Sequence, residues 1–225
     1  MILRYLDFHS YIFRKKNVSF LIKLPTVKDT WLLNCTEGSQ FNFLNQSLKI
    51  NNLSKIIIPD LHIFSLSGLL GLLSTLNLVG RIKSLHIYAP INIEYYLDLG
   101  KKYSRTNFRY VLHVHALKTG LIINQYSSRM YTFKLNGYYE FLIVQSEQYG
   151  TFDLERAKSN NLIPGPIYGK LKKGLSFVIP DGLILDGCDF TSSNDLGFQM
   201  CYLFSYFYRK KILKIVDKNN FTLFF

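Results

Sequence analysis

Cysteine is scarce in this chain of 225 residues, and its pattern excludes two kinds of site. The three cysteines, Cys35, Cys188 and Cys201, are odd in number and show no CxxC spacing. They predict neither a disulfide framework nor a cysteine-ligated zinc site, and they suit a reducing compartment. We expect them to be small, buried apolar residues.

Negative charge is also scarce, because 15 Asp and Glu residues stand against 27 Lys and Arg, which gives a formal net charge of +12. An excess of this size favours a polyanionic partner, and nucleic acid is favoured over an anionic membrane surface. Alanine occurs only at Ala89, Ala116 and Ala157, while Ile, Asn, Lys, Phe and Tyr abound. This bias is typical of AT-rich genomes, such as those of organelles or parasites.

Long apolar runs are few. Arg4, Asp7 and His9 interrupt the first residues, so we expect no signal peptide. The uncharged run from Ile63 to Gly80 could be a membrane helix, but glycines and hydroxyl residues dilute it, which favours a buried core helix. Membrane anchoring through this run is the least favoured reading.

Apolar alternation and β-branched runs predict strands within residues 1–8, 17–24, 30–35, 55–59, 84–90, 108–117 and 130–145. Helical spacing predicts a helix over 92–104, and Glu37 with Gln40 can open another. The sequence turns polar and rich in glycine and proline near Tyr149. We therefore expect a core of residues 1–148, an inserted segment of 149–190, and a return to the core over 191–225. Strands alternating with helices predict an α/β or α+β layered fold.

Several segments occur in an order that resembles the tRNase Z family, a branch of the metallo-β-lactamase fold that trims the 3′ end of precursor tRNA. They are KKNVSF, LLNCTEGSQ, KIIIPDLHIFSLSGLLGLLSTL, SLHIYAP, LNGYYEFLIVQ, LIPGPIYGKLKKG and IPDGLILDGCDF. The resemblance runs from residue 1 to about 205. It implies an αββα sandwich, incomplete at the C-terminus, with an inserted arm, similar to reduced tRNase Z-like reading frames of algal plastid genomes.

The metal loop departs from this family. The family reads His-x-His-x-Asp-His there, and its two zinc ions generate hydroxide near neutral pH. This chain reads PDLHIFSLSGLL, in which His62 aligns either with the second histidine, leaving Asp60 at the first, or with the last, leaving Leu61 at the acidic position. The resemblance places Asn136 and Ser205, or a neighbour of Ser205, at two further ligand positions. We expect no intact metal site, no catalytic residues and no cofactor, although zinc is expected if a partner completes the site.

Other histidines give weaker signals. His113 and His115 share a strand face with ligand-like spacing, but no third ligand is close in sequence, and the resemblance places their strand away from the metal loop. A polar strand face is the favoured reading. His9 and His86 are expected to be lone structural residues.

The inserted segment keeps its motif. Pro164, Gly165, Pro166 and Gly169 shape a stiff turn, and Lys170, Lys172 and Lys173 add charge suited to RNA phosphates. The competing reading is a solvated basic loop. Lys16 and Asn17, beside Arg14 and Lys15, are expected to make a second RNA contact, and Arg209, Lys210 and Lys211 are weaker candidates.

The combined reading is a degenerate tRNase Z-like protein, without independent hydrolysis, whose arm contacts tRNA or precursor tRNA. The alternative is a tRNA 3′-processing endoribonuclease that is active only with ligands or a subunit from a partner. The segments MCYLFSYFY and FTLFF are expected to leave apolar surface exposed, so a homodimer or a complete tRNase Z subunit is the expected protein partner. The expected location is the plastid stroma, or otherwise the cytoplasm, with no membrane contact.

Overall fold

The computed structural model describes most of the chain. It covers residues 2–6, 19–24, 28–45, 48–125, 127–135, 137–147, 149–179, 182, 184–192, 197–205, 210–216 and 221–224. In residues 2–6, 198, 203–205, 210–216 and 221–224 it describes the backbone alone.

The first of two six-stranded sheets combines antiparallel and parallel pairing. Its strands, in order across the sheet, are β1 (Ile2–Leu6), β2 (Ser19–Leu24), β3 (Asp29–Leu33), β4 (Leu53–Ile57), β5 (Leu85–Ala89) and β6 (Leu112–Ala116). Pairing is antiparallel from β1 to β3 and parallel from β3 to β6. Parallel neighbours need crossover connections, and here each crossover contains a helix.

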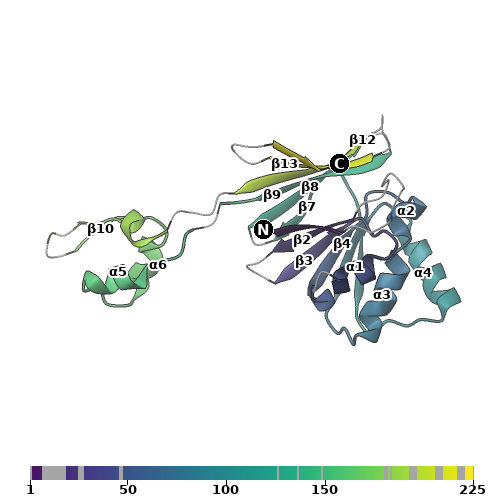
Figure 1. Ribbon diagram of the computed structural model, residues 1–225, viewed down its shortest axis with the longest axis horizontal. Helices are drawn as coiled ribbons and strands as arrows, with labels where there is room; N and C mark the ends of the chain where they lie inside the picture. The colour runs from purple at the N-terminus through teal and green to yellow at the C-terminus, as the bar shows by residue number, and fades with distance from the viewer. Residues whose placement is uncertain are drawn as a thin grey trace.

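The helices of these crossovers cover one face of the first sheet (Figure 1). They are α1 (Ser39–Asn45), α2 (Ile63–Leu66), α3 (Leu69–Leu78) and α4 (Ile93–Ser104), with the 3-10 turn η1 (Ile50–Asn52). Leu69, Leu72, Leu73 and Leu76 of α3 are fully buried against the sheet. The centre of the run 63–80 is therefore core, as the sequence predicted, but the run forms two helices and its ends, Ile63, Phe64, Leu78 and Val79, are exposed.

No helix in the described part of the chain has the length and apolar character needed to cross a membrane.

The second sheet is antiparallel throughout and packs on the other face of the first. Its strands, in order, are β14 (Phe221–Phe224), β13 (Lys210–Val216), β12 (Phe198–Ser205), β9 (Tyr138–Gln145), β8 (Ser128–Leu135) and β7 (Gly120–Gln125). Buried Trp31 and Ile57 of the first sheet meet Phe141 and Met200 of the second. None of the described helices covers the outer face of the second sheet (Figure 1).

Two expectations about burial are wrong in part. Met200 and Tyr202 of β12 are 0% and 1% exposed, because alternate residues of this strand point into the space between the sheets. Cys188 is exposed and Cys201 is half-buried, whereas Cys35 is buried as expected. Burial raises the pKa of the Cys35 thiol to about 12, which keeps it protonated and unreactive.

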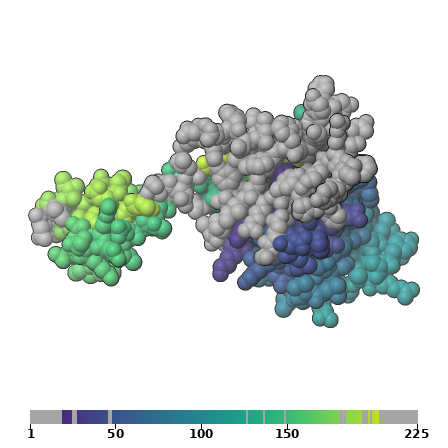
Figure 2. Space-filling view, viewed as in Figure 1, coloured from purple at the N-terminus to yellow at the C-terminus, as the bar shows by residue number. Residues whose placement is uncertain are grey.

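Between β9 and β12 the chain forms a small lobe with its own apolar core (Figures 1 and 2). Its elements are α5 (Leu154–Ser159), α6 (Pro166–Leu171), β10 (Phe177–Val178), β11 (Ile184–Leu185) and η2 (Gly187–Phe190). Ala157, Leu171, Leu185 and Phe190 are buried at its centre. We call the lobe, residues 149–192, the arm.

Candidate functional site

The loop after β4 is held between the two sheets. The Ile58 N–H donates a hydrogen bond to the Tyr88 carbonyl over 2.8 Å, and the Tyr139 N–H donates to the Pro59 carbonyl over 3.2 Å. These bonds tie the loop to β5 on one side and to β9 on the other. The loop therefore lies at the carboxyl end of a parallel strand, where open α/β sheets place their ligands.

Residues of α2 and of the turn between α2 and α3 also pack closely against the segment that follows β3. The Gly68 N–H donates to the Cys35 carbonyl over 3.1 Å, and the Cys35 N–H donates to the Ser65 carbonyl over 3.3 Å. A Cβ atom added to Gly68 would lie 1.9 Å from the Thr36 carbonyl oxygen. Glycine is required here because the two backbones leave no room for a side chain.

The Asp60 side chain forms a hydrogen bond within this loop. Its side chain is 7% exposed, and its Oδ1 accepts a hydrogen bond from the His62 N–H over 3.1 Å. This is the local turn that aspartate favours, two residues ahead of the donor. Asp60 thus stabilises the conformation of this loop.

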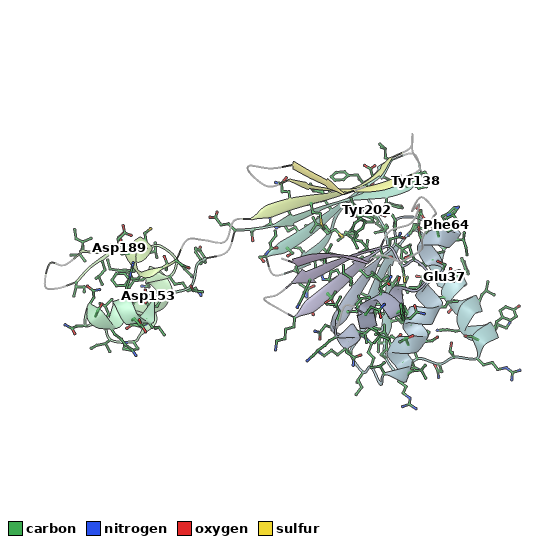
Figure 3. All side chains as sticks on the ribbon, in the orientation of Figure 1. Glu37, Phe64, Tyr138, Asp153, Asp189 and Tyr202 are labelled. Carbon is green, nitrogen blue, oxygen red and sulfur yellow. The ribbon has the colours of Figure 1, made fainter. Side chains whose placement is uncertain are left out.

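His62 is exposed and lies at the start of α2. Its Nδ1 accepts a weak hydrogen bond from the Phe64 N–H over 3.4 Å, as a helix cap does, and its ring contacts the Phe64 ring at 5.0 Å between centroids. Figure 3 shows Phe64 beside the helices and Tyr202 on the second sheet. His62 therefore also has a structural role.

Tyr202 is a residue of this region that the sequence did not single out. It is 1% exposed, and its hydroxyl has no hydrogen-bond partner among the described residues. Burial, and then the negative charge of Asp60, raises the pKa of this phenol well above its ordinary value. Its alternation with Met200 in β12 is the signal that could have found it.

The side chains at the other predicted ligand positions are not described. Asn136 lies outside the described residues, and Ser205 ends β12 with only its backbone described. Among the described residues no three His, Cys, Asp or Glu side chains come together in a way that could hold a metal ion. The described donors, Asp60 and His62, do not fit a two-zinc centre, because each zinc ion takes about four ligands.

His86 is not a lone histidine, so that expectation is wrong. Parallel pairing of β5 with β6 sets His86 beside His113 and Tyr88 beside His115. The His86 and His113 rings stack at 4.7 Å, and His86 Nδ1 lies 3.0 Å from His115 Nε2. Burial, followed by the neighbouring His113, lowers the pKa of both His86 and His115. These rings lie on β5 and β6.

The predicted RNA-contacting residues that are described lie together on the arm. Pro166 is the first residue of α6, with Gly165 as its N-cap, and Gly169 lies within the helix. Lys170, Lys172 and Lys173, at the end of the same helix, are exposed, as are Pro164, Gly165, Pro166 and Gly169. Lys16 and Asn17, with Arg14 and Lys15, lie outside the described residues, and the side chains of Lys210 and Lys211 are not described.

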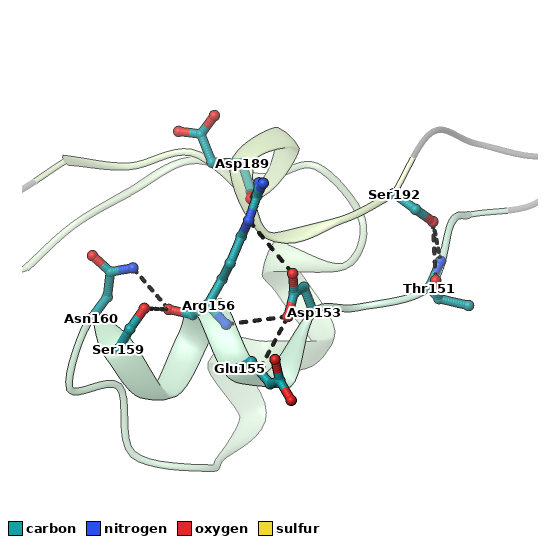
Figure 4. Close-up of polar contacts among 8 residues, drawn as sticks. All are labelled: Thr151, Asp153, Glu155, Arg156, Ser159, Asn160, Asp189 and Ser192. Carbon is teal, nitrogen blue, oxygen red and sulfur yellow. Dashed lines mark hydrogen bonds and ion pairs between the residues drawn. The ribbon is translucent and has the colours of Figure 1, made fainter.

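Polar contacts hold the base of the arm together (Figure 4). Asp153 caps α5, since its Oδ1 accepts from the N–H groups of Glu155 and Arg156 at 3.0 and 3.1 Å. The Arg156 Nη1 donates to the Asp189 carbonyl over 2.9 Å and so joins α5 to η2. These contacts present α6 on a built scaffold rather than on a loose loop.

The fold and the loop after β4 place the chain in the metallo-β-lactamase fold class. The structure of the short form of human tRNase Z superposes with a TM-score of 0.54 at 20% identity, covering 64% of each chain, which supports the fold. No protein-family model matches the chain.

Relatives found by sequence show which proteins of this fold class the chain is related to. An uncharacterized ycf56 protein of Porphyra purpurea is 38% identical over 184 residues, which cover 80% of this chain and 70% of the relative. A ribonuclease Z of Nostoc punctiforme is 32% identical over 196 residues, covering 84% of this chain and 60% of the relative. The chain belongs to the family of the algal ycf56 proteins and is a homologue of cyanobacterial ribonuclease Z. It spans about 60% of the length of the ribonuclease Z relatives.

Proposed function

We propose that this protein binds tRNA or precursor tRNA through its arm and has no hydrolytic activity of its own. The observation that carries the proposal is the role of the polar side chains in the loop after β4. Asp60 and His62 stabilise the turn and the start of α2, and no third ligand joins them among the described residues.

The chemistry of the family explains why this matters. Two metal ions would generate hydroxide and neutralise charge on the phosphodiester, and each ion needs several anionic or imidazole ligands to replace its water. One carboxylate and one imidazole cannot hold two such ions. The vestigial positions are therefore Asp60 and His62, together with Asn136 and Ser205 as the resemblance places them.

The lysines at the end of α6 support RNA binding because they lie close together, although the arm has no excess of positive charge. The arm as a whole holds as many acidic as basic residues: Asp153, Glu155, Asp181, Asp186 and Asp189 against Arg156, Lys158, Lys170, Lys172 and Lys173. Among the described residues, Lys170, Lys172 and Lys173 form no ion pair. Their charge is available to phosphate oxygens, which bind lysine without base-specific contacts.

Gly169 gives a second argument for a ligand at α6. A Cβ atom added there would have no heavy atom within 4 Å, and alanine would favour the helix by about 1 kcal/mol. Nothing in the described chain requires glycine at this exposed position. A ligand that approaches the helix backbone closely would require it.

The remaining parts of the proposal rest on the relatives. The ycf56 homologues of Porphyra purpurea and Pyropia yezoensis support a location in the plastid. The tRNA ligand follows from the ribonuclease Z relatives. A second copy of the chain or a complete ribonuclease Z subunit is the proposed protein partner.

Zinc content and RNA binding, measured on one purified sample, test the proposal. Elemental analysis should find no stoichiometric zinc, precursor tRNA should stay uncleaved, and a gel shift should weaken as salt rises. The double variant Lys172→Gln/Lys173→Gln should weaken the shift and reduce the salt slope by about 1.5, because two phosphate contacts are lost.

A charge-matched variant provides the control. Lys28→Asn/Lys83→Gln removes two exposed lysines that lie outside the arm and should leave tRNA binding close to wild type. Stoichiometric zinc with cleavage at the 3′ end would overturn the proposal. The alternative is a nuclease whose site is completed by a partner. It would be favoured if cleavage appeared only when the protein is mixed with a full-length ribonuclease Z whose own metal ligands have been mutated.

A further inference from the structure

A basic cavity lies at the opposite end of the parallel strands from the Asp60 loop. It has a volume of about 480 Å³ and is lined by the starts of β3 and β4, by η1, by the segment that leads into β5 with His86, and by the last residue of β7, Gln125. Lys55 near the start of β4 and Asp60 after its end are separated by roughly 16 Å, at about 3.3 Å per residue. The cavity is therefore separate from the candidate site.

Cations dominate its lining. Lys28, Lys55, Arg81 and Lys83 surround it, with Asp29 as the one acidic residue that lines it. The wall also contains Leu53, His86 and asparagine, serine and glutamine side chains, and the last three kinds can donate hydrogen bonds to an oxyanion.

Lys55 is the least satisfied of these cations. It is 5% exposed, and its Nζ donates a hydrogen bond to Gln125 Oε1 and lies 5.0 Å from the centre of the Trp31 ring. It forms no ion pair with any described carboxylate, although Asp29 is close enough to oppose the lowering of its pKa by burial. A buried ammonium that contacts a neutral amide and an aromatic ring has lost much of its hydration, and an anion would compensate for that loss.

Arg81 makes the wall rigid. It is 3% exposed, and its guanidinium donates to the carbonyl oxygens of Lys83 and Ser84 at 2.7 Å each and of Asn51 at 3.3 Å. These bonds fix the segment before β5 against the segment before β4. The donors that line the cavity are thus positioned in advance, which reduces the entropy lost when a ligand binds.

We propose that this cavity binds the phosphate group of a small phosphorylated ligand. A phosphate dianion matches several converging cations and accepts many hydrogen bonds, whereas a metal ion would be repelled. The group could be carried by a free oligophosphate or by a nucleotide, and both present the same chemistry to Lys28, Lys55 and Lys83. The site is independent of tRNA binding by the arm.

Calorimetric titration at constant ionic strength tests this proposal with four probes: tripolyphosphate, adenosine monophosphate, adenosine and sodium chloride. Tripolyphosphate should bind, and adenosine and chloride should not. Binding of adenosine monophosphate would assign a nucleotide source, and its failure to bind would assign oligophosphate. Absence of tripolyphosphate binding at millimolar concentration would overturn the proposal.

Lys28→Asn/Lys83→Gln is the test variant, because both side chains are exposed and asparagine tolerates the positive φ of 57° at residue 28. It should weaken tripolyphosphate binding about tenfold, through the loss of two nearby charges. The arm variant Lys172→Gln/Lys173→Gln should bind like wild type. Equal weakening by both variants would show a general effect of net charge and would overturn the assignment.

Discussion

Asp60 and His62 are joined by a hydrogen bond of 3.1 Å in which the His62 N–H donates to the Asp60 carboxylate. This bond closes a turn two residues long, and the His62 ring then caps α2. One alignment with the family places both residues at metal-ligand positions. In this structure the Asp60 carboxylate accepts from the loop backbone, and the His62 ring contacts Phe64 of α2. A loop that is stabilised in this way can keep its shape without a metal ion, because its own side chains satisfy its backbone donors.

Removal of the Tyr202 hydroxyl should not destabilise the protein. This hydroxyl is buried without a hydrogen-bond partner among the described residues, so Tyr202→Phe should leave the free energy of unfolding unchanged or raise it by up to about 1 kcal/mol. Urea denaturation measures the change. Tyr139→Phe is the matched control, because Tyr139 donates to the Leu117 carbonyl over 3.1 Å, and it should lose about 1 kcal/mol. A Tyr202→Phe variant as destabilised as Tyr139→Phe would reveal a partner for this hydroxyl.

Gly68→Ala should be strongly destabilising. The new Cβ would meet the Thr36 carbonyl oxygen at 1.9 Å, so one of the two backbones must move, at a cost of about 3 kcal/mol. Gly71→Ala, within α3, is the control. Its Cβ would meet only the flexible end of the Gln40 side chain, at 3.3 Å. That variant should be neutral or stabilising in thermal unfolding. Equal effects at the two positions would contradict the close packing described for Gly68.

Gly169→Ala should separate stability from binding. Alanine favours α6 by about 1 kcal/mol and meets no atom of the described chain, so thermal unfolding should occur at the same or a higher temperature. RNA binding in a gel shift should nevertheless weaken, since a ligand that approaches the helix backbone would meet the new methyl group. Unchanged RNA affinity would remove Gly169 from the proposed interface.

Acid should destabilise the protein through the stacked histidines. Burial and neighbouring groups place the pKa of His86 and His115 below the ordinary 6.5, so the unfolded chain takes up protons more readily. The stability that their neutral rings contribute is present above pH 6.5 and is lost as the pH falls below it. The groups that oppose protonation of His86 are His113, His115 and Lys55.

The melting temperature measured from pH 7.5 to pH 5.5 checks this sign. It should fall with acid, and His86→Gln should give a smaller fall, because one of the two depressed pKa values is removed. An unaltered slope in His86→Gln would rule out this cluster as a source of acid sensitivity.

Local sequence was enough to predict most elements. The β-branched run of residues 55–59 became β4, the helical spacing of 92–104 became α4, and the segment 130–145 became the hairpin of β8 and β9. The order of motifs also predicted the metallo-β-lactamase fold and the homology to ribonuclease Z, both now confirmed. These features depend on spacing along the chain, which the sequence states directly.

Contacts between distant strands were decided only by the tertiary structure. His86 and His113 are 27 positions apart in sequence, and only the parallel register of β5 and β6 brings them together. Tyr202 belongs to β12 and Asp60 to the loop after β4 of the other sheet, and the basic cavity around Lys55 draws its lining from four strands. The sequence determined which residues could carry charge or bind an ion. The packing of one sheet on the other determined which of them meet, because register and burial depend on the whole fold.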